Sequence, residues 1–189
     1  MTKFIFDRIV SLFALPIVIL LCIPLFVIIR LESPGNPLFI QQRVGRNLRT
    51  FYLFKLRTMR ADTIQAGSHE VSGAQVTKVG KFLRRTKLDE LPQIWNVFIG
   101  DMSFVGPRPC LPTQRELVEY RQKRNVFSVR PGITGPAQIA GIDMSKPLDL
   151  SIADAKYVIK NNFLSDVKLI LVSLLGRGSG DAVNLDKDI

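Results

Sequence analysis

The pattern of apolar and polar positions divides the chain into a long apolar segment near the N-terminus and a more polar remainder. No charged residue occurs from Ile9 to Ile29. A straight helix of that length rises about 31 Å, roughly the hydrocarbon thickness of a bilayer. Pro16 and Pro24 interrupt the segment, and a proline inside a helix removes a hydrogen bond and tends to kink the axis. We expect a membrane bend at Pro24.

The charges that flank this segment bear on how it meets a membrane. Lys3 and Arg8 precede it. The cations that follow it are Arg30, Arg43, Arg46, Arg49, Lys55, Arg57 and Arg60. Because cytoplasmic loops favour Lys and Arg, positive charge on both flanks predicts that both ends lie on one face, as in a re-entrant helix.

Two other interpretations of the segment stay open from the residues alone. A plain spanning helix is the one that length favours. A cleaved signal peptide fits less well, because its apolar region is typically about 7 to 15 residues and ends at a small-residue cleavage site. This segment is longer and lacks such a site.

Beyond the apolar segment, the pattern predicts a hairpin followed by helices. Ser33 to Pro37 form a linker, and Leu38 to Met59 is typical of two strands that turn near Gly45 to Asn47. Alternation puts Lys55 and Arg57 on the same strand face. The predicted helices are Val79 to Thr86, Leu91 to Ile99, Glu116 to Val126, Ile152 to Asn161 and Val167 to Leu175. We expect Asp62 to Gln75, which contains His69, to be a loop, and the tail from Gly176 to be mobile.

Charge and cysteine content narrow the class of protein. The chain has 26 Lys and Arg against 16 Asp and Glu, which suits phosphates, nucleic acid or an anionic membrane surface. A basic nucleic-acid-binding protein does not explain Ile9 to Ile29, and the sequence has no zinc-finger spacing or RNA-binding signature. We therefore expect no nucleic acid partner. Cys22 and Cys110 have no spacing typical of a disulfide framework or a metal site, which favours a reducing compartment.

The candidate chemistry lies in the tract from Asp89 to Pro109. It opens with the adjacent acids Asp89 and Glu90 and contains Arg108 between two prolines. Two neighbouring acids can divide nucleophile, metal-ligand and proton-transfer roles, while cations hold a phosphorylated substrate. Pro92 suits the first turn of a helix, and Asp89 is expected to cap that helix. The alternative is an acidic helix start without catalysis, in a membrane-anchored scaffold.

Four motifs occur together in a specific order and spacing: KLRTM at Lys55 to Met59, LDELPQIWNV at Leu88 to Val97, GDMSFVGPRP at Gly100 to Pro109, and RPGITG at Arg130 to Gly135. In these motifs the chain resembles the small monotopic phosphoglycosyl transferases. These are bacterial sugar transferases that start glycan assembly on a polyprenol phosphate. The resemblance extends from the apolar segment to about Gly141.

The resemblance implies a reaction and a re-entrant membrane helix. In that family the aspartate of the acid pair attacks the β-phosphorus of a UDP-sugar and releases UMP, which leaves a phosphosugar on the aspartate. Polyprenyl (undecaprenyl) phosphate then takes up the sugar phosphate. By position, Asp89 is the nucleophile, and Glu90 helps with Mg²⁺ and with protons. Asp89 and Glu90 are thus the expected metal ligands, and Mg²⁺ the expected cofactor, because oxygen ligands suit that ion.

Further residues are expected to bind the substrate. They are Lys55, Arg57, Arg84, Pro107, Arg108, Pro109, Arg130, Gly132 and Gln138. Arg108 is expected to be preset by its flanking prolines for a phosphate or for the uridine end of the donor. The glycines after Arg130 would let backbone amides approach a phosphate, although turns use the same residues.

Together these observations predict an α+β, predominantly helical protein at the cytoplasmic face of the bacterial inner membrane. We expect residues 1–34 to form the re-entrant helix and its linker. Residues 35–189 would form a cytoplasmic catalytic domain with a small β-hairpin and interfacial amphipathic helices. The expected partners are a UDP-sugar, polyprenyl phosphate and membrane lipid. The sequence leaves homodimer formation and the identity of the sugar open.

Overall fold

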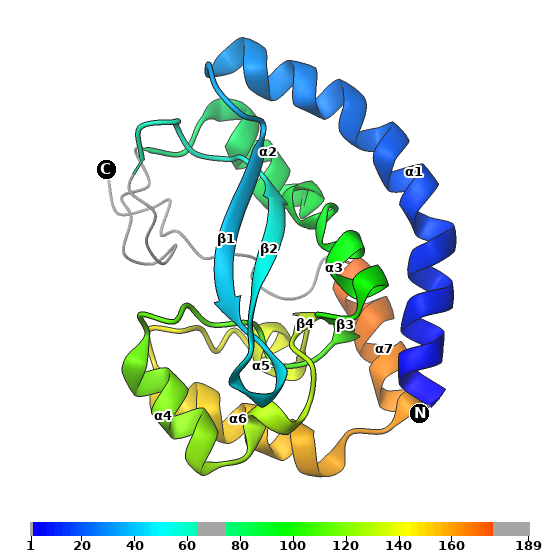
Figure 1. The fold of residues 1–189 in the computed structure, drawn as a ribbon, viewed down its shortest axis with the longest axis vertical. Coiled ribbons are helices and arrows are strands. Elements are labelled where there is room, and N and C mark those ends of the chain that lie inside the picture. The colour runs from blue at the N-terminus through cyan, green and yellow to red at the C-terminus, as the bar shows by residue number, and fades with distance from the viewer. Residues whose placement is uncertain (1, 64–74, 176–189) are drawn as a thin grey trace.

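The computed structural model describes residues 2–63 and 75–175. Over these residues the protein is mostly helical, with two small sheets and an apolar N-terminal helix (Figure 1). The predicted predominantly helical α+β class is therefore confirmed. His69 and the tail from Gly176 lie outside the described residues.

The N-terminal helix α1 (Thr2–Glu32) runs without a break through Pro16 and Pro24. It curves along one side of the molecule (Figure 1). Within the described part of the chain, α1 alone is long and apolar enough to cross a bilayer. Its buried residues are Asp7, Ser11, Val18, Cys22 and Ile29. Their spacing of four and seven residues repeats every eleven, which keeps them on one stripe of the helix.

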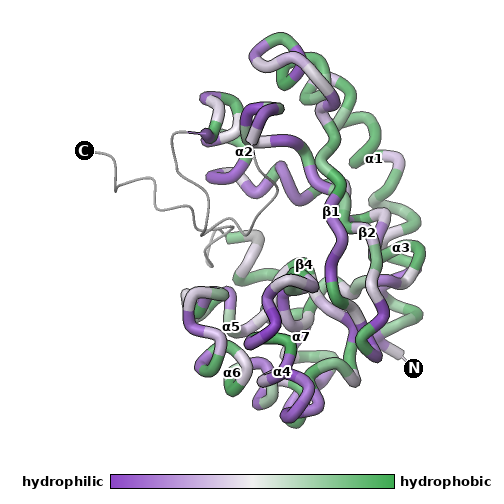
Figure 2. Tube along the Cα trace, turned by 60° about the vertical axis from the view of Figure 1, so that its left-hand side comes forward, coloured by the Kyte–Doolittle hydropathy of each residue, from purple (hydrophilic) through white to green (hydrophobic). Residues whose placement is uncertain are grey.

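That buried stripe packs on the body of the protein along most of the helix. Val18, Cys22 and Ile29 form a core cluster with Leu56 and Leu83. The partly buried residues packed against this cluster are Leu25, Phe26, Val79, Leu88, Leu91 and Ile94. The other faces of α1 expose large apolar side chains. Most of the helix has the colour of hydrophobic residues in Figure 2.

Polar contacts hold both ends of α1 to the same body. Near the start, the Lys3 ammonium donates to Asp166 and to the Tyr157 hydroxyl, the latter at 2.7 Å. At the other end, the Glu32 carboxylate accepts hydrogen bonds from the backbone N–H groups of Lys78 at 2.7 Å and Val79 at 3.0 Å. These N–H groups begin helix α2 (Lys78–Thr86), where a carboxylate is favourable.

The predicted hairpin is confirmed. Strands β1 (Leu38–Val44) and β2 (Thr50–Leu56) pair antiparallel, with Leu38 opposite Leu56 and Val44 opposite Thr50. The chain reverses through a turn closed by the Gly45 N–H and the Arg49 carbonyl. The alternation in β2 buries Phe51, Leu53 and Lys55, as its sequence pattern indicates.

A second sheet is present that the sequence pattern did not predict. Strands β3 (Ser103–Val105) and β4 (Gly132–Thr134) pair parallel, and each has three residues. Strands this short show no readable alternation. Gly132 is needed here for packing, because a Cβ at that position would lie 2.0 Å from the Gly106 nitrogen.

All five predicted helices are confirmed, with shifts of up to five residues at their ends. They are α2, α3 (Gln93–Ile99), α4 (Arg115–Lys123), α6 (Pro147–Lys160) and α7 (Phe163–Leu174). The short helix α5 (Pro136–Ile139) was not predicted. A second core cluster joins Val44 and Cys110 to Leu117 of α4, Ala137 of α5 and Leu150 of α6.

A buried ion pair joins α4 to α6. The Arg121 guanidinium donates two hydrogen bonds to Asp154 Oδ2, at 2.6 and 2.9 Å. Both residues are about 1% exposed. Burial lowers the pKa of Arg121, but the Asp154 carboxylate and Cys110 together outweigh that effect and the pKa is raised. Arg121 therefore stays charged inside the protein.

We predict that Asp154→Ala lowers the free energy of unfolding by about 3–5 kcal/mol, because it leaves the Arg121 charge buried without its carboxylate. Asp149→Ala is the matched control, since Asp149 is an exposed acid in the first turn of the same helix. Its loss should cost at most about 1 kcal/mol. Urea unfolding of the detergent-solubilised protein measures both, and equal losses would contradict the assigned role of the pair.

Candidate active site

The acid pair lies in a single turn of 3₁₀ helix, η3 (Leu88–Glu90), between α2 and α3. Lys87 ends α2 in the left-handed conformation, with a φ of 58°, which turns the chain into η3. Asp89 and Glu90 are both buried, at 5% and 8% exposure. The expectation that Asp89 caps the next helix is wrong, because the N-cap of α3 is Pro92. The acids thus belong to a separate turn and do not begin the helix.

Two cations from distant parts of the chain meet Glu90. Lys55 Nζ of β2 lies 3.2 Å from Glu90 Oε1, and Arg108 Nη2 donates to the same oxygen at 2.9 Å. The side chains of Lys55 and Glu90 are under 10% exposed, and that of Arg108 is 15% exposed. A buried carboxylate is stable only when cations and hydrogen bonds compensate its lost hydration. Glu90 is therefore fixed between two positive groups, directly after Asp89 in the chain.

A small cavity lies beside this group. The residues that line it are Arg43, Leu53, Lys55, Gln93, Arg108, Pro109 and Gly132. Four of the predicted substrate-binding residues, namely Lys55, Arg108, Pro109 and Gly132, are thus brought together at one place. The wall is cationic, which suits a phosphate-bearing ligand.

Arg43 also lines this cavity. From the sequence it was recognised only as one of the cations that follow the apolar segment. Its guanidinium donates to the Pro109 carbonyl at 3.0 Å and to Gln41 Oε1 at 2.6 Å. Gln41 and Arg43 are buried two residues apart on β1. The alternation of Gln41 and Arg43 in the sequence could therefore have indicated this role, since polar residues on the inward face of a strand indicate a polar site.

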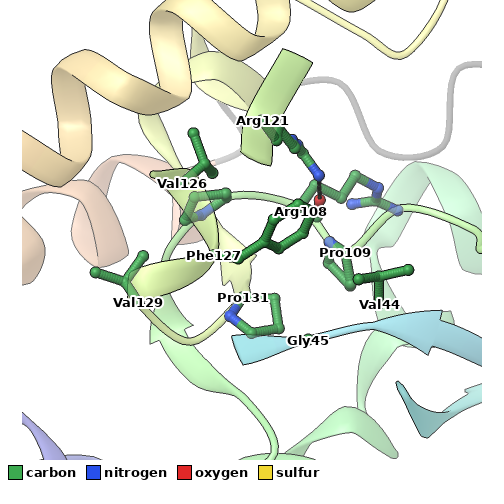
Figure 3. Close-up of a pocket in the computed structure, with 10 residues that line it drawn as sticks. Val44, Gly45, Arg108, Pro109, Arg121, Val126, Phe127, Val129 and Pro131 are labelled. Atoms are coloured by element: carbon green, nitrogen blue, oxygen red, sulfur yellow. Dashed lines mark hydrogen bonds between the residues drawn. The ribbon is translucent and has the colours of Figure 1, made fainter. Parts of the chain in front are cut away.

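The buried ion pair of Arg121 and Asp154 contacts the loop that carries Arg108. Arg121 Nη1 donates to the Arg108 carbonyl at 2.8 Å, which Figure 3 shows as a dashed line. Pro107, Pro109, Phe127 and Pro131 surround this contact. Arg121 and Asp154 thus position Arg108 indirectly. No sequence motif indicated either residue, because α4 and α6 come together only in the folded protein.

Other predicted substrate residues make their hydrogen bonds away from the acid pair. Arg57 donates to the carbonyls of Ser33 and Pro34 in the linker after α1. Arg84 Nε donates to Thr58 Oγ1 at 2.9 Å. Both residues brace the linker and α2.

Arg130 and Gln138 are also separate from the acid pair's cations. Arg130 Nε donates to the Gly100 carbonyl at 2.8 Å, and Arg130 lines a different cavity at the turn of the hairpin. Gln138 Nε2 donates to the Ile133 carbonyl at 3.0 Å, within the segment around β4. RPGITG builds β4 and the N-cap of α5, and the Arg130 side chain that precedes β4 bonds to Gly100.

The site offers two carboxylates to the expected Mg²⁺, those of Asp89 and Glu90. No cluster of three or more His, Cys, Asp or Glu side chains occurs among residues 2–63 and 75–175. Mg²⁺ usually keeps several waters and binds one or two carboxylates together with substrate phosphates. Asp89 and Glu90 supply two such carboxylates, so the site suits an ion that arrives with a phosphorylated substrate rather than an ion held by protein ligands alone.

Comparisons with known proteins identify the family of the chain. Residues 1–176 match the model of a family described as bacterial sugar transferase. The chain is 37% identical to the exopolysaccharide production protein PSS of Rhizobium leguminosarum bv. phaseoli, over 93% of this chain and 96% of that protein.

Longer relatives match 70% or more of this chain. The galactosyl transferase CpsE of Streptococcus agalactiae is 37% identical over 85% of this chain and 40% of its own length. The UDP-N-acetylgalactosamine-undecaprenyl-phosphate N-acetylgalactosaminephosphotransferase of Aeromonas hydrophila is 40% identical over 70% of this chain and 32% of its own length. The chain therefore spans only a third to two fifths of these two relatives. The matched region includes the motifs that build the site, and the protein belongs to the bacterial sugar transferase family.

Proposed function

We propose that the protein is a phosphoglycosyl transferase that moves a sugar 1-phosphate from a UDP-sugar to polyprenyl phosphate. The observation that carries this proposal is the buried turn of Asp89 and Glu90, with Lys55 and Arg108 on Glu90. Family membership supports the reaction class, and the name of the Aeromonas relative contains both the nucleotide sugar and the undecaprenyl phosphate. In a bacterium this reaction is the first membrane step of surface polysaccharide synthesis.

The reaction proceeds in two displacements at one phosphorus. A carboxylate oxygen of Asp89 attacks the β-phosphorus of the donor, and the bond from that phosphorus to the bridging oxygen breaks. UMP leaves with the electron pair. A phosphate oxygen of the polyprenyl phosphate then attacks the same phosphorus, the bond to Asp89 breaks, and the free carboxylate returns. A weak nucleophile such as a carboxylate needs the phosphate charge to be neutralised nearby.

The chain's own residues divide this work. Lys55 and Arg108 offer positive charge at the position where the β-phosphate meets Asp89, and the bond from Arg121 fixes the loop of Arg108. Glu90 keeps the two cations in place. It also takes the proton that the polyprenyl phosphate loses if this phosphate arrives protonated. Mg²⁺ bound at Asp89 and Glu90 would add Lewis-acid neutralisation of the diphosphate.

The contacts of α1 support a re-entrant or surface-lying helix over a span. The helix is about 46 Å long, and its two ends are bonded to the same body through Lys3 and Glu32. A straight span would carry one end away from that body. Exposed apolar side chains on the remaining faces of α1 would meet lipid, and the catalytic domain would then lie on the cytoplasmic face. The bend at Pro24 remains a prediction within this arrangement.

We predict that Asp89→Asn abolishes UMP release from UDP-sugars in the presence of undecaprenyl phosphate, because the amide is not a nucleophile. Lys55→Gln and Arg108→Gln should each lower kcat/KM about 100-fold or more, since each removes a charge from the site. A chelator should stop the wild-type reaction, and added Mg²⁺ should restore it. A panel of UDP-sugars in this assay also identifies the donor.

Asp149→Asn and Lys156→Gln serve as controls, because both residues are exposed on α6. They should keep wild-type turnover. Full activity in Asp89→Asn would refute Asp89 as the nucleophile, whereas a wild-type chain that releases no UMP from any UDP-sugar would support the non-catalytic scaffold.

We also predict that tags placed at Met1 and Ile189 are both digested by protease in inverted membrane vesicles and are both protected in intact spheroplasts. This result is expected if both ends of α1 stay on the cytoplasmic face. Digestion of the N-terminal tag in spheroplasts would establish a spanning helix.

A further inference from the structure

A second cavity opens at the turn of the β1–β2 hairpin, away from the acid pair. Its volume is about 250 Å³. Its lining includes Arg46, Arg49, Gly100, Asp101 and Arg130. The turn begins five residues along β2 from Lys55, which corresponds to about 17 Å of extended strand. This hairpin-turn pocket is therefore distinct from the candidate active site.

Three guanidinium groups face this pocket with few partners. In the described part of the chain, Arg46 and Arg49 make no side-chain hydrogen bond or ion pair, and Arg130 has a single hydrogen bond, from Nε to the Gly100 carbonyl. A guanidinium carries five donors. Most of the donor capacity around the pocket is therefore available to a ligand.

The charges around the pocket are unbalanced. The pKa of Arg130 is lowered by burial and then by the positive charges of Arg46 and Arg8. Asp101 is the acid in the pocket wall, and burial raises its pKa, which weakens its value as a counter-ion. Asp101 and the nearby Asp7 thus act on Arg130 against Arg46 and Arg8, and Arg49 adds a further cation to the wall, which leaves an excess of positive charge. An anion in the pocket would remove this repulsion.

The pocket also lies beside the point where α1 turns from polar to apolar. The Arg130 guanidinium stacks 4.4 Å from the centroid of the Phe4 ring, and that of Arg8 lies 4.9 Å from the same ring. Arg8 also donates to the Ile99 carbonyl, next to Gly100 of the pocket wall. Ile9, the first residue of the uncharged segment, follows Arg8 and is exposed. If α1 enters the bilayer, the pocket lies at the depth of the lipid headgroups.

We propose that the hairpin-turn pocket binds the phosphate of an anionic membrane phospholipid. Arginine forks match phosphate oxygens in geometry and charge. A soluble phosphate ester has the same chemistry, but the position beside Phe4 and Ile9 favours a headgroup whose acyl chains continue along α1. The proposal gives this pocket a role apart from donor and acceptor binding, and it does not depend on the proposed reaction.

Titration of dihexanoyl phosphatidylglycerol into the detergent-solubilised full chain, followed by calorimetry, tests the proposal. Phosphatidylglycerol should bind at least tenfold more tightly than dihexanoyl phosphatidylcholine. The double variant Arg46→Gln with Arg49→Gln should weaken this binding about 30-fold, since each basic group near an anionic headgroup contributes about 1 kcal/mol. Glycerol 1-phosphate should bind more weakly than the lipid, because it lacks the chains.

The matched control is the double variant Arg115→Gln with Lys123→Gln. It removes the same charge from exposed residues of α4, which lies on the opposite side of the molecule from α1 (Figure 1). Its effect should stay below about twofold. Equal loss in the two variants, or no preference for phosphatidylglycerol, would refute the pocket. Equal affinity for glycerol 1-phosphate would refute the lipid source, and displacement of the lipid by UDP would assign the pocket to the donor.

Discussion

The site depends on one buried carboxylate, Glu90, which accepts contacts from both Lys55 and Arg108. These three residues come from a strand, a 3₁₀ turn and a loop, and no local structure would bring them together. Two buried cations this close would repel each other without the shared acid. Glu90 therefore stabilises the charged forms of Lys55 and Arg108 in a largely buried position, next to the turn that carries Asp89. A phosphate that enters this place meets a preorganised positive field, which is the main requirement for phosphoryl transfer by a weak nucleophile.

The same short segments also attach the apolar helix. Leu56 follows Lys55 in β2, and Leu88 and Leu91 flank the acid pair, and all three pack in the cluster with Val18, Cys22 and Ile29 of α1. One face of these segments thus contacts the apolar helix while the other forms the polar site. Since neighbouring residues serve both surfaces, Asp89 and Glu90 are held close to the apolar helix α1. This arrangement suits an acceptor whose phosphate is attached to a lipid chain.

Sequence patterns predicted the elements that have a clear period and missed the ones that have none. The hairpin and the helices α2, α4 and α7 followed from alternation and helical spacing. The three-residue strands β3 and β4 were too short to show a pattern. The roles of Arg43, Arg121 and Asp154 depend on long-range packing, which periodicity does not encode. For the same reason, the motif arginines Arg57 and Arg130 could not be separated from Lys55 and Arg108 before the fold was known.

The central claim is that Asp89 itself carries the sugar phosphate during the reaction. The most direct measurement is incubation of the full chain with a labelled UDP-sugar without acceptor, followed by quenching and peptide mass spectrometry. The account predicts a sugar phosphate on the peptide that contains Asp89, and its disappearance when undecaprenyl phosphate is added. An active enzyme that shows no adduct, or an adduct on another residue, would contradict the account.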